Sequence, residues 1–219
     1  MNRELAEIIR IYATKTDREL HEYLLGKSKN NLIGVIIDLI TMYINDKNSS
    51  TLREYITVAI AGYEHTEDKT GYNGYKQSVY GKPLMCEAKP KNVRSDRKRK
   101  LNGGGNFTDY TYERLERDLE ENPEMLVSGF VDGRLIYVLE FPFRCTSFVS
   151  ELRRQLNRRF PGGDITGQFL RSANFDYRDY INCKDLKVVF CLPKPELKKY
   201  RNKIVRNFYS FLEGVAPDD

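Results

Sequence analysis

The chain contains 219 residues, which is enough for a single domain with a full hydrophobic core. Hydrophobic residues make up 40% and charged residues 31% of the chain, a composition that excludes an intrinsically disordered protein. No apolar run approaches the ~20 residues that span a bilayer, and residues 1–10 carry acids and lack the long apolar stretch of a secretory signal. We therefore expect a cytoplasmic protein without a membrane partner.

The net charge of +5 is distributed unevenly along the chain. Residues 94–100 (RSDRKRK) hold five basic groups, and residues 151–160 (ELRRQLNRRF) hold four arginines. Such clusters suit a polyanion, although either run alone is as typical of a solvated surface. Two histidines and four cysteines without a CxxC pair argue against a structural zinc site.

The first part of the chain is expected to be helical. Residues 3–25 partly follow helical spacing, and residues 31–46 (NLIGVIIDLITMYIND) predict an apolar helix in the core. Residues 50–62 predict a third helix, with Ser50 or Thr51 as its N-cap.

The pattern then changes to strands and later alternates with helices. Residues 70–77 and 84–89 predict two strands joined by a turn around Tyr80-Gly81, and residues 93–107 predict a basic, glycine-rich loop that is either ordered and functional or mobile. The elements expected after this loop are a charged helix at 109–122, a hairpin of 125–131 and 134–141 around Asp132-Gly133, a helix at 147–160, a strand at 186–192 and a helix at 195–213.

This order predicts a mixed α/β (α+β) fold with a central mixed β-sheet flanked by helices. We expect a single domain over residues 1–219, with an N-terminal helical part (1–62), a core (63–192) and a C-terminal helix (193–219).

Two charged residues follow the apolar start of the strand at 84–89. Side chains alternate along a strand, so Glu87 and Lys89 face the same way. A carboxylate can hold Mg²⁺, which prefers oxygen ligands, and the carbonyl of Ala88 is a natural additional ligand. The ammonium can orient a water or stabilise negative charge on a phosphate. The alternative is a same-face ion pair, worth under ~1 kcal/mol if exposed.

The stretch GYNGYKQSVYGKPLMCEAKPKN at 71–92 resembles the catalytic hairpin of the PD-(D/E)xK nuclease superfamily, especially type II restriction endonucleases. The resemblance covers roughly residues 64–92 and maps Glu87 and Lys89 onto the (D/E)xK pair. It implies a prokaryotic enzyme that uses Mg²⁺ to hydrolyse phosphodiester bonds in both strands of duplex DNA at a short specific sequence. A homodimer is implied as well, because two-fold sites are read by two-fold proteins.

The family also places an acid on the preceding strand, and two residues compete for that position. With a turn at Tyr80-Gly81, Glu87 lies opposite Asn73 or Gly74, and Asp68 lies about 17 Å further along. Asp68 reaches a shared Mg²⁺ only if the turn is wider or the strand is bulged. Asn73 can ligate a metal through its carbonyl but brings no charge.

Glu64 is a further candidate, because helix glutamates before the hairpin often join the metal site in this family. An exposed helix-end charge is the alternative for Glu64. The asparagine at position 73 also keeps open a DNA-binding module that has lost catalysis, and the same fold could instead act on a repair or recombination substrate.

Several residues are expected to contact duplex DNA. Arginine and lysine suit phosphates and guanine, asparagine suits adenine, and glycines let backbone amides come close to a phosphate. The candidates are Lys91, Arg94, Arg97, Lys98, Arg99, Lys100, Asn102, Asn106, Arg171, Asn174 and Arg178. We expect residues 165–183, with little regular structure, to carry the sequence specificity. The N-terminal helices or the helix at 147–160 are the candidates for the dimer interface.

Overall fold

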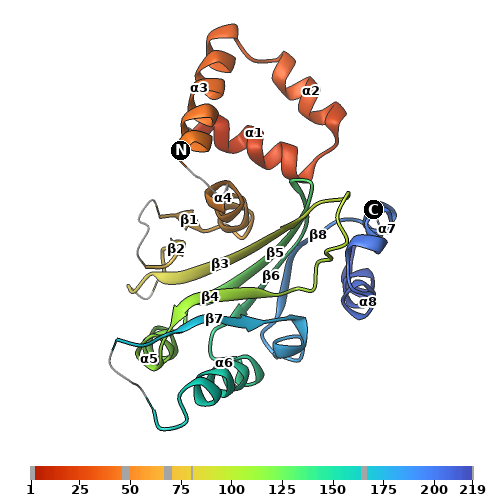
Figure 1. The fold of residues 1–219 in the computed structure, drawn as a ribbon. Helices are drawn as coiled ribbons and strands as arrows, with labels where there is room; N and C mark the ends of the chain where they lie inside the picture. Colours follow the sequence, from red (N-terminus) through yellow and green to blue (C-terminus); the bar gives the residue numbers. More distant parts are fainter. Residues whose placement is uncertain (1–2, 46–49, 67–70, 80, 164–166, 219) are drawn as a thin grey trace.

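The computed structural model describes residues 3–45, 50–66, 71–79, 81–163 and 167–218. It is a mixed α/β structure with a central mixed sheet flanked by helices, as the sequence predicted. The sheet has six strands in the order β1-β2-β3-β5-β6-β8, and β4 and β7 form a separate two-stranded ribbon (Figure 1). The strands are β1 (Glu64–His65), β2 (Gly74–Lys76), β3 (Leu84–Val93), β4 (Gly105–Tyr110), β5 (Glu124–Val131), β6 (Arg134–Pro142), β7 (Leu170–Phe175) and β8 (Lys187–Cys191).

Helices cover both faces of the sheet. The α-helices are α1 (Arg3–Thr14), α2 (Asp17–Leu25), α3 (Lys29–Asn45), α4 (Ser50–Ile60), α5 (Tyr112–Glu121), α6 (Thr146–Arg159), α7 (Lys194–Lys199) and α8 (Arg206–Val215), and two 3-10 turns are η1 (Tyr177–Asp179) and η2 (Arg201–Lys203). The helices α1 to α4 lie on one side of the sheet, and α5, α6, α8 and the ribbon lie on the other (Figure 1).

The sheet is mixed because a crossover helix separates two neighbouring strands. Strand β3 pairs with β2 in the antiparallel sense and with β5 in the parallel sense, and α5 lies between β3 and β5 in the chain. The β5–β6 hairpin turns at Asp132-Gly133, where both residues have positive φ (47° and 80°). This is the two-residue turn that the Asp-Gly pair predicted, because such turns need positive φ at both positions.

Two expected single helices are divided in the structure. Residues 3–25 form α1 and α2, because the Thr16 side chain accepts from the Glu19 amide while the Glu19 carboxylate accepts from the Thr16 amide. This capping box starts a new helix at Asp17. Residues 195–213 likewise fall into α7, η2 and α8, so the prediction of one C-terminal helix was wrong.

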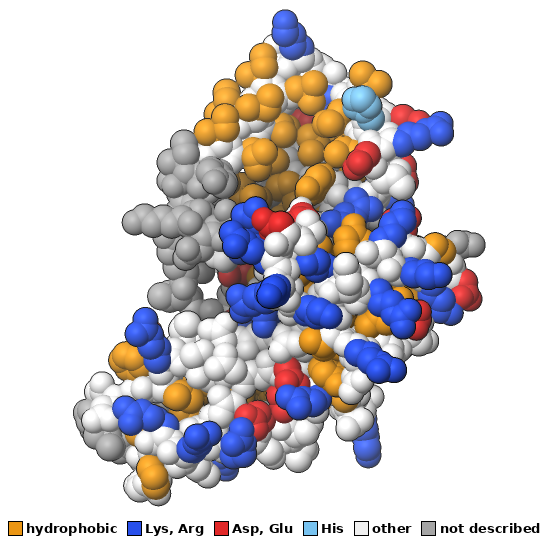
Figure 2. All heavy atoms as spheres, turned by 45° about the vertical axis from the view of Figure 1, so that its right-hand side comes forward, with side chains coloured by type: hydrophobic (Ala, Val, Ile, Leu, Met, Phe, Trp, Pro, Cys, Tyr) orange, Lys and Arg blue, Asp and Glu red, His pale blue; other side chains and the backbone are white. Residues whose placement is uncertain are grey.

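The prediction that the apolar helix at 31–46 lies in the core was also wrong. Helix α3 buries Val35, but four of its isoleucines are between 47% and 58% exposed: Ile33, Ile36, Ile37 and Ile40. Their i, i+3, i+4 and i+7 spacing puts them on one face of the helix. Hydrophobic side chains gather over this N-terminal end of the molecule, while Lys and Arg dominate the middle of the same view (Figure 2). Among the described residues, no helix is both long and apolar enough to cross a membrane.

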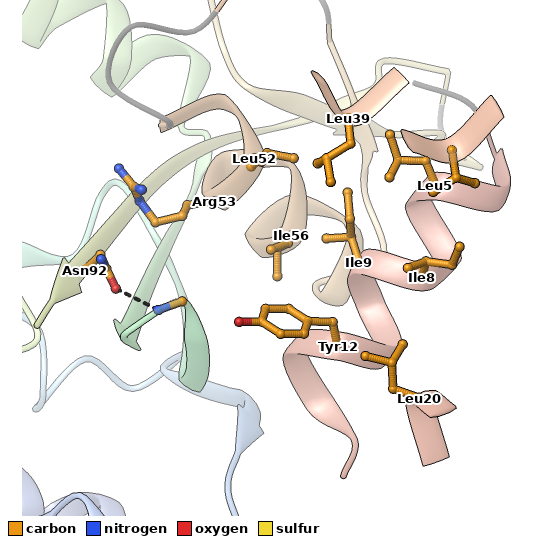
Figure 3. A pocket seen from close by; sticks show the side chains of 12 residues that line it. Leu5, Ile8, Ile9, Tyr12, Leu20, Leu39, Leu52, Arg53, Ile56 and Asn92 are labelled. Atoms are coloured by element: carbon orange, nitrogen blue, oxygen red, sulfur yellow. Dashed lines mark hydrogen bonds between the residues drawn. The ribbon is translucent and has the colours of Figure 1, made fainter. Parts of the chain in front are cut away.

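A cavity of about 390 Å³ lies between the N-terminal helices and the sheet. Leu5, Ile9 and Ile56 are among the apolar side chains that point into it, and Arg53 and Asn92 stand at its opposite side (Figure 3). The N-terminal layer therefore packs less completely against the sheet than a close-packed protein interior would.

The ribbon of β4 and β7 has no counterpart among the elements predicted from the sequence. Residues 105–110 were expected partly as loop and partly as helix, and 170–175 as irregular, yet Asn106 pairs directly with Asn174. The ribbon crosses the sheet closely, because a Cβ on Gly105 would lie 2.8 Å from the Cβ of Lys89. Only glycine allows this approach, and it brings β4 over the face that carries Glu87.

Strand β3 continues through Pro90 to Val93, whereas the expected strand ended at residue 89. Pro90 is opposite Ser128 of β5. The amide of Ala88 points toward the β2 side, and alternation gives position 90 the same direction. Strand β2 already begins opposite Cys86, so a missing N–H at position 90 breaks no bond of the parallel ladder.

Candidate functional site

The site is built on the middle of β3, where successive side chains face opposite layers. Cys86 and Ala88 are buried under the N-terminal helices, where the side chain of Val58 on α4 belongs to the same apolar cluster. Glu87 and Lys89 point to the other side, toward α5 and the ribbon. The alternation that the sequence predicted therefore holds.

Glu87 and Lys89 form a close, largely buried ion pair. The Lys89 Nζ donates to the Glu87 Oε1 at 2.6 Å, and Glu87 is only 6% exposed. Lys89 Nζ also lies 4.5 Å from the centre of the Phe107 ring on β4. Burial of a carboxylate requires a partner of opposite charge, and the aromatic face adds a second favourable contact for the ammonium.

Arg114 is a second cation at Glu87, and sequence reasoning missed it. Its Nη2 lies 3.3 Å from the same Glu87 Oε1, and its Nε lies 3.6 Å from the Oδ2 of Asp118, one turn further along α5. Asp118 is fully buried and accepts a hydrogen bond from the Tyr72 hydroxyl at 3.0 Å. The signal available in the sequence was the Arg114–Asp118 spacing on an otherwise exposed, charged helix.

The loss of hydration on burial affects the pKa of Asp118 more than its neighbouring cations do. Burial raises the pKa of Asp118 above its usual range, while the charge of Arg114 and the Tyr72 hydrogen bond lower it. The nearby Arg117 donates to Asp118 Oδ1 at 3.2 Å. Asp118 is thus a fixed buried acid that joins α5 to the segment preceding β2.

The hairpin register places one of the two candidates for the upstream position, Asn73. Gly74 pairs with Cys86, which puts Asn73 opposite Glu87, one of the two positions that the tight turn predicted. The Asn73 Oδ1 accepts from the Ala88 amide at 2.7 Å, and its Nδ2 lies 3.4 Å from Glu54 Oε2. The amide oxygen is therefore engaged by the strand backbone. Asp68 lies outside the described residues.

Glu64 lies on β1, and the expectation of a helix glutamate at that position was wrong. It pairs with Tyr75 of β2, whose hydroxyl donates to Glu64 Oε2 at 2.7 Å. Glu64 is exposed and accepts its hydrogen bond from Tyr75, whereas Glu87 is paired with Lys89 and Arg114. The structure therefore gives Glu64 and Glu87 separate partners.

The oxygens that β3 offers are of the kind that Mg²⁺ prefers. Within the described residues, no three His, Cys, Asp or Glu side chains lie together as a metal cluster. Mg²⁺ is commonly held by one or two carboxylates with waters and substrate phosphates, and Glu87 supplies one buried carboxylate. The Ala88 carbonyl points to the β2 side together with its amide, beyond the end of β2. This donor set is all oxygen and fits the ion.

Some of the predicted DNA-contacting residues lie near the Glu87–Lys89 ion pair. Lys91, two residues after Lys89, donates to the Asn102 Oδ1 at 3.0 Å. Asn102, Asn174 and Arg178 line one polar cavity of about 450 Å³. Burial lowers the pKa of Lys91, with a smaller contribution from the charge of Arg99.

The glycine-rich segment beside Lys91 is held by contacts with other segments, while its expected functional role stays a prediction. The Tyr177 amide donates to the Asn102 carbonyl at 3.1 Å, and the Tyr180 hydroxyl donates to the Gly103 carbonyl at 2.5 Å. Leu101 forms a parallel bridge with Ile204. These contacts fix the segment that leads into β4.

The remaining predicted DNA contacts are more dispersed. Six of them are exposed and do not line the polar cavity: Arg94, Arg97, Lys98, Arg99, Lys100 and Arg171. Arg94 is paired with Asp96, and Arg178 with Asp176 at 2.6 Å. The segment 165–183 was expected to lack regular structure, but Arg171 and Asn174 lie on β7 and Arg178 lies in η1. Asn106, on β4, is exposed beside Asn174.

Comparison of the chain with protein-family models, with curated proteins and with solved structures finds no match in any of the three.

Proposed function

We propose that this chain is a Mg²⁺-dependent, restriction-type endonuclease that hydrolyses phosphodiester bonds in both strands of duplex DNA at a short specific sequence. The observation that carries the proposal is the buried Glu87–Lys89 pair on β3, with a 2.6 Å contact between the two head groups. An isolated surface ion pair would be exposed and would need no covering by Arg114 and Phe107.

In this proposal the residues of β3 have different roles, in metal binding and in activation of water. Glu87 holds Mg²⁺ with the Ala88 carbonyl, and Asp68 or Asn73 remains the candidate for a further ligand. The chemistry that bound Mg²⁺ supplies is polarisation of the phosphate and a lowered pKa of bound water. Lys89 orients the attacking water or stabilises the negative charge that develops on the phosphate.

The ribbon and the segment before it supply a surface for DNA. The outward face of β4 and β7 carries Asn106, Thr108, Ser172 and Asn174 in directly opposed pairs, so it offers hydrogen-bonding groups without charge. Two-stranded ribbons fit the major groove, and asparagine pairs with adenine there. Lys91 and the basic residues 94–100 would hold the phosphates.

A homodimer is part of the proposal, because cleavage of both strands needs two sites related by symmetry. The exposed isoleucines of α3 support the N-terminal helices as the interface. An isologous contact uses the same patch twice, and an apolar helix face without charge on its stripe can pair with its own copy. The helix at 147–160, which is α6 in the structure, carries exposed arginines and is the less suitable surface.

A DNA-binding module without catalysis is the second candidate. The observation that favours it is that the oxygens expected to bind the metal already accept hydrogen bonds. The Asn73 Oδ1 accepts from the Ala88 amide, and Glu87 Oε1 accepts from Lys89 and Arg114. A nuclease of the same fold that requires branched or mismatched DNA is distinguished by its substrate.

Digestion of a plasmid of known sequence with Mg²⁺, followed by mapping of the fragment ends, tests the proposal. We expect discrete fragments from the wild type. Lys89→Ala should retain DNA binding and lose cleavage by about 10²–10⁴-fold, and Glu87→Ala should also fail to cut. The control is Lys187→Ala, which breaks the pair of Lys187 with the buried Glu140 at 2.8 Å on other strands of the sheet, where the lysine is exposed.

The outcomes separate the candidates. If wild type and variants shift DNA but none cuts it, the binding module is correct and the nuclease is not. Cutting by Glu87→Ala at the wild-type rate would remove Glu87 from the site. We expect Asn73→Ala to be more damaging than Asp68→Ala, because the register puts Asn73 opposite Glu87. A wild-type rate for Asn73→Ala would exclude that residue.

A further inference from the structure

Arg114 lies between two buried carboxylates that belong to different elements. Its Nη2 is 3.3 Å from Glu87 Oε1 on β3, and its Nε is 3.6 Å from Asp118 Oδ2 on α5. The side chains of Glu87 and Asp118 are 7% and 2% exposed. One guanidinium thus partly neutralises both acids, and each of these two contacts is longer than the 2.6 Å contact of Lys89.

The guanidinium has an unmet hydrogen bond on the Asp118 side. Among the described residues, the buried Nε of Arg114 has no hydrogen-bond partner, although Asp118 Oδ2 is the nearest acid in its direction. An unsatisfied buried donor is costly, so a small movement toward Asp118 would gain a hydrogen bond. The same movement would release Glu87 Oε1.

The surroundings allow such a movement. The Arg114 guanidinium lies 5.3 Å from the Phe107 ring centre and 5.8 Å from that of Tyr110, so two aromatic faces border its path. Asp118 is held in place by Tyr72 and Arg117 whether or not Arg114 approaches. Lys89 keeps its own contact with Glu87.

We infer that Arg114 is a positioning residue with two places: it neutralises Glu87 while no divalent cation is bound, and it withdraws to Asp118 when one binds. The inference rests on the proposed metal site at Glu87. A guanidinium at Oε1 repels an incoming divalent cation, since charges of +1 and +2 some 5 Å apart in a water-like dielectric change a binding constant by about tenfold or more. Arg114 therefore sets how tightly the site takes its ion before DNA arrives.

Titration of the full chain with Mn²⁺, followed by electron paramagnetic resonance in the absence of DNA, tests this without any cleavage. We expect Arg114→Gln to bind Mn²⁺ about tenfold more tightly than the wild type, and Arg114→Lys, which keeps the charge, to remain near the wild type. The control is Arg153→Gln, which removes an equal charge from an exposed pair with Glu116. It should leave the affinity unchanged.

Two failures can be told apart. If Glu87→Gln binds Mn²⁺ as well as the wild type does, the metal site of the proposed function is wrong, and the role of Arg114 falls with it. If binding depends on Glu87 but Arg114→Gln binds no more tightly, the metal site stands and the inference about Arg114 is overturned.

A measurement on the unmodified chain covers the case in which Arg114→Gln does not fold. The Nε–H resonance of Arg114 should move on addition of Mg²⁺, and its exchange with water should slow, as the new hydrogen bond to Asp118 forms. A Glu87 carboxyl resonance that shifts with Mg²⁺ while the Arg114 Nε–H resonance does not would overturn the inference.

Discussion

The two faces of the six-stranded sheet are covered in contrasting ways. On the side of Glu87, Phe148 contacts the rings of Phe107, Phe141, Phe143 and Phe175, and all five are buried. On the other side, the N-terminal helices leave a cavity of about 390 Å³. The dense layer holds the ribbon over Lys89, whereas the N-terminal layer leaves isoleucines of α3 exposed. The side chains are thus packed more closely on the face that carries the candidate site.

The largest effect is expected from the centre of the aromatic layer. Phe148→Ala removes a ring that four others contact, so the free energy of unfolding should fall by about 3–5 kcal/mol. Urea unfolding followed by circular dichroism measures this. A loss below about 1 kcal/mol would show that the layer can collapse around the gap, and the contrast between the faces would be weaker than proposed.

One substitution made on both faces should change stability in opposite directions. Val127→Leu, in the dense layer, adds a methylene to a filled core and should cost about 1–3 kcal/mol. Val35→Leu, which extends into the cavity, should stabilise the chain by up to about 0.8 kcal/mol. Urea unfolding of both variants checks the pair. Destabilisation by both would mean that the cavity wall is as rigid as the aromatic layer.

The smallest effect on folding is expected on the outer face of α3. Ile37→Glu lies on the exposed isoleucine stripe, so the free energy of unfolding of the monomer should change by no more than about 0.5 kcal/mol. Sedimentation velocity should nevertheless show a homodimer for the wild type and a monomer for this variant. The matched control is Val79→Glu, at an exposed apolar residue away from the stripe. A variant that stays dimeric would place the interface elsewhere.

The sequence predicted the parts of the site that depend on local periodicity. Alternation along β3 predicted the common direction of Glu87 and Lys89, and the turn limited the position opposite Glu87 to Asn73 or Gly74, of which the structure has Asn73. The contact of Arg114 with Glu87 could not be predicted from the sequence. The two residues are 27 positions apart, and their contact depends on how the crossover helix α5 docks on the sheet. No local pattern encodes that docking.

Two errors in the fold have clear physical causes. The ribbon was missed because β4 contains polar residues and glycine, and its partner β7 is about 70 positions away: Gly105 pairs with Phe175. Helix α3 was assigned to the core because residues 31–46 are mostly apolar, and such a composition normally means burial. In the single chain only part of α3 has a covering layer, and Val35 marks that part.

Pro90 has a consequence for how this molecule meets its neighbours. Beyond Cys86, no described strand hydrogen-bonds to β3 on the β2 side, so that stretch resembles an unprotected sheet margin. A strand that paired with β3 there would find the pyrrolidine ring of Pro90 at a position where it needs a backbone N–H donor. The proline thus discourages edge-to-edge pairing of β3 with a strand of another molecule.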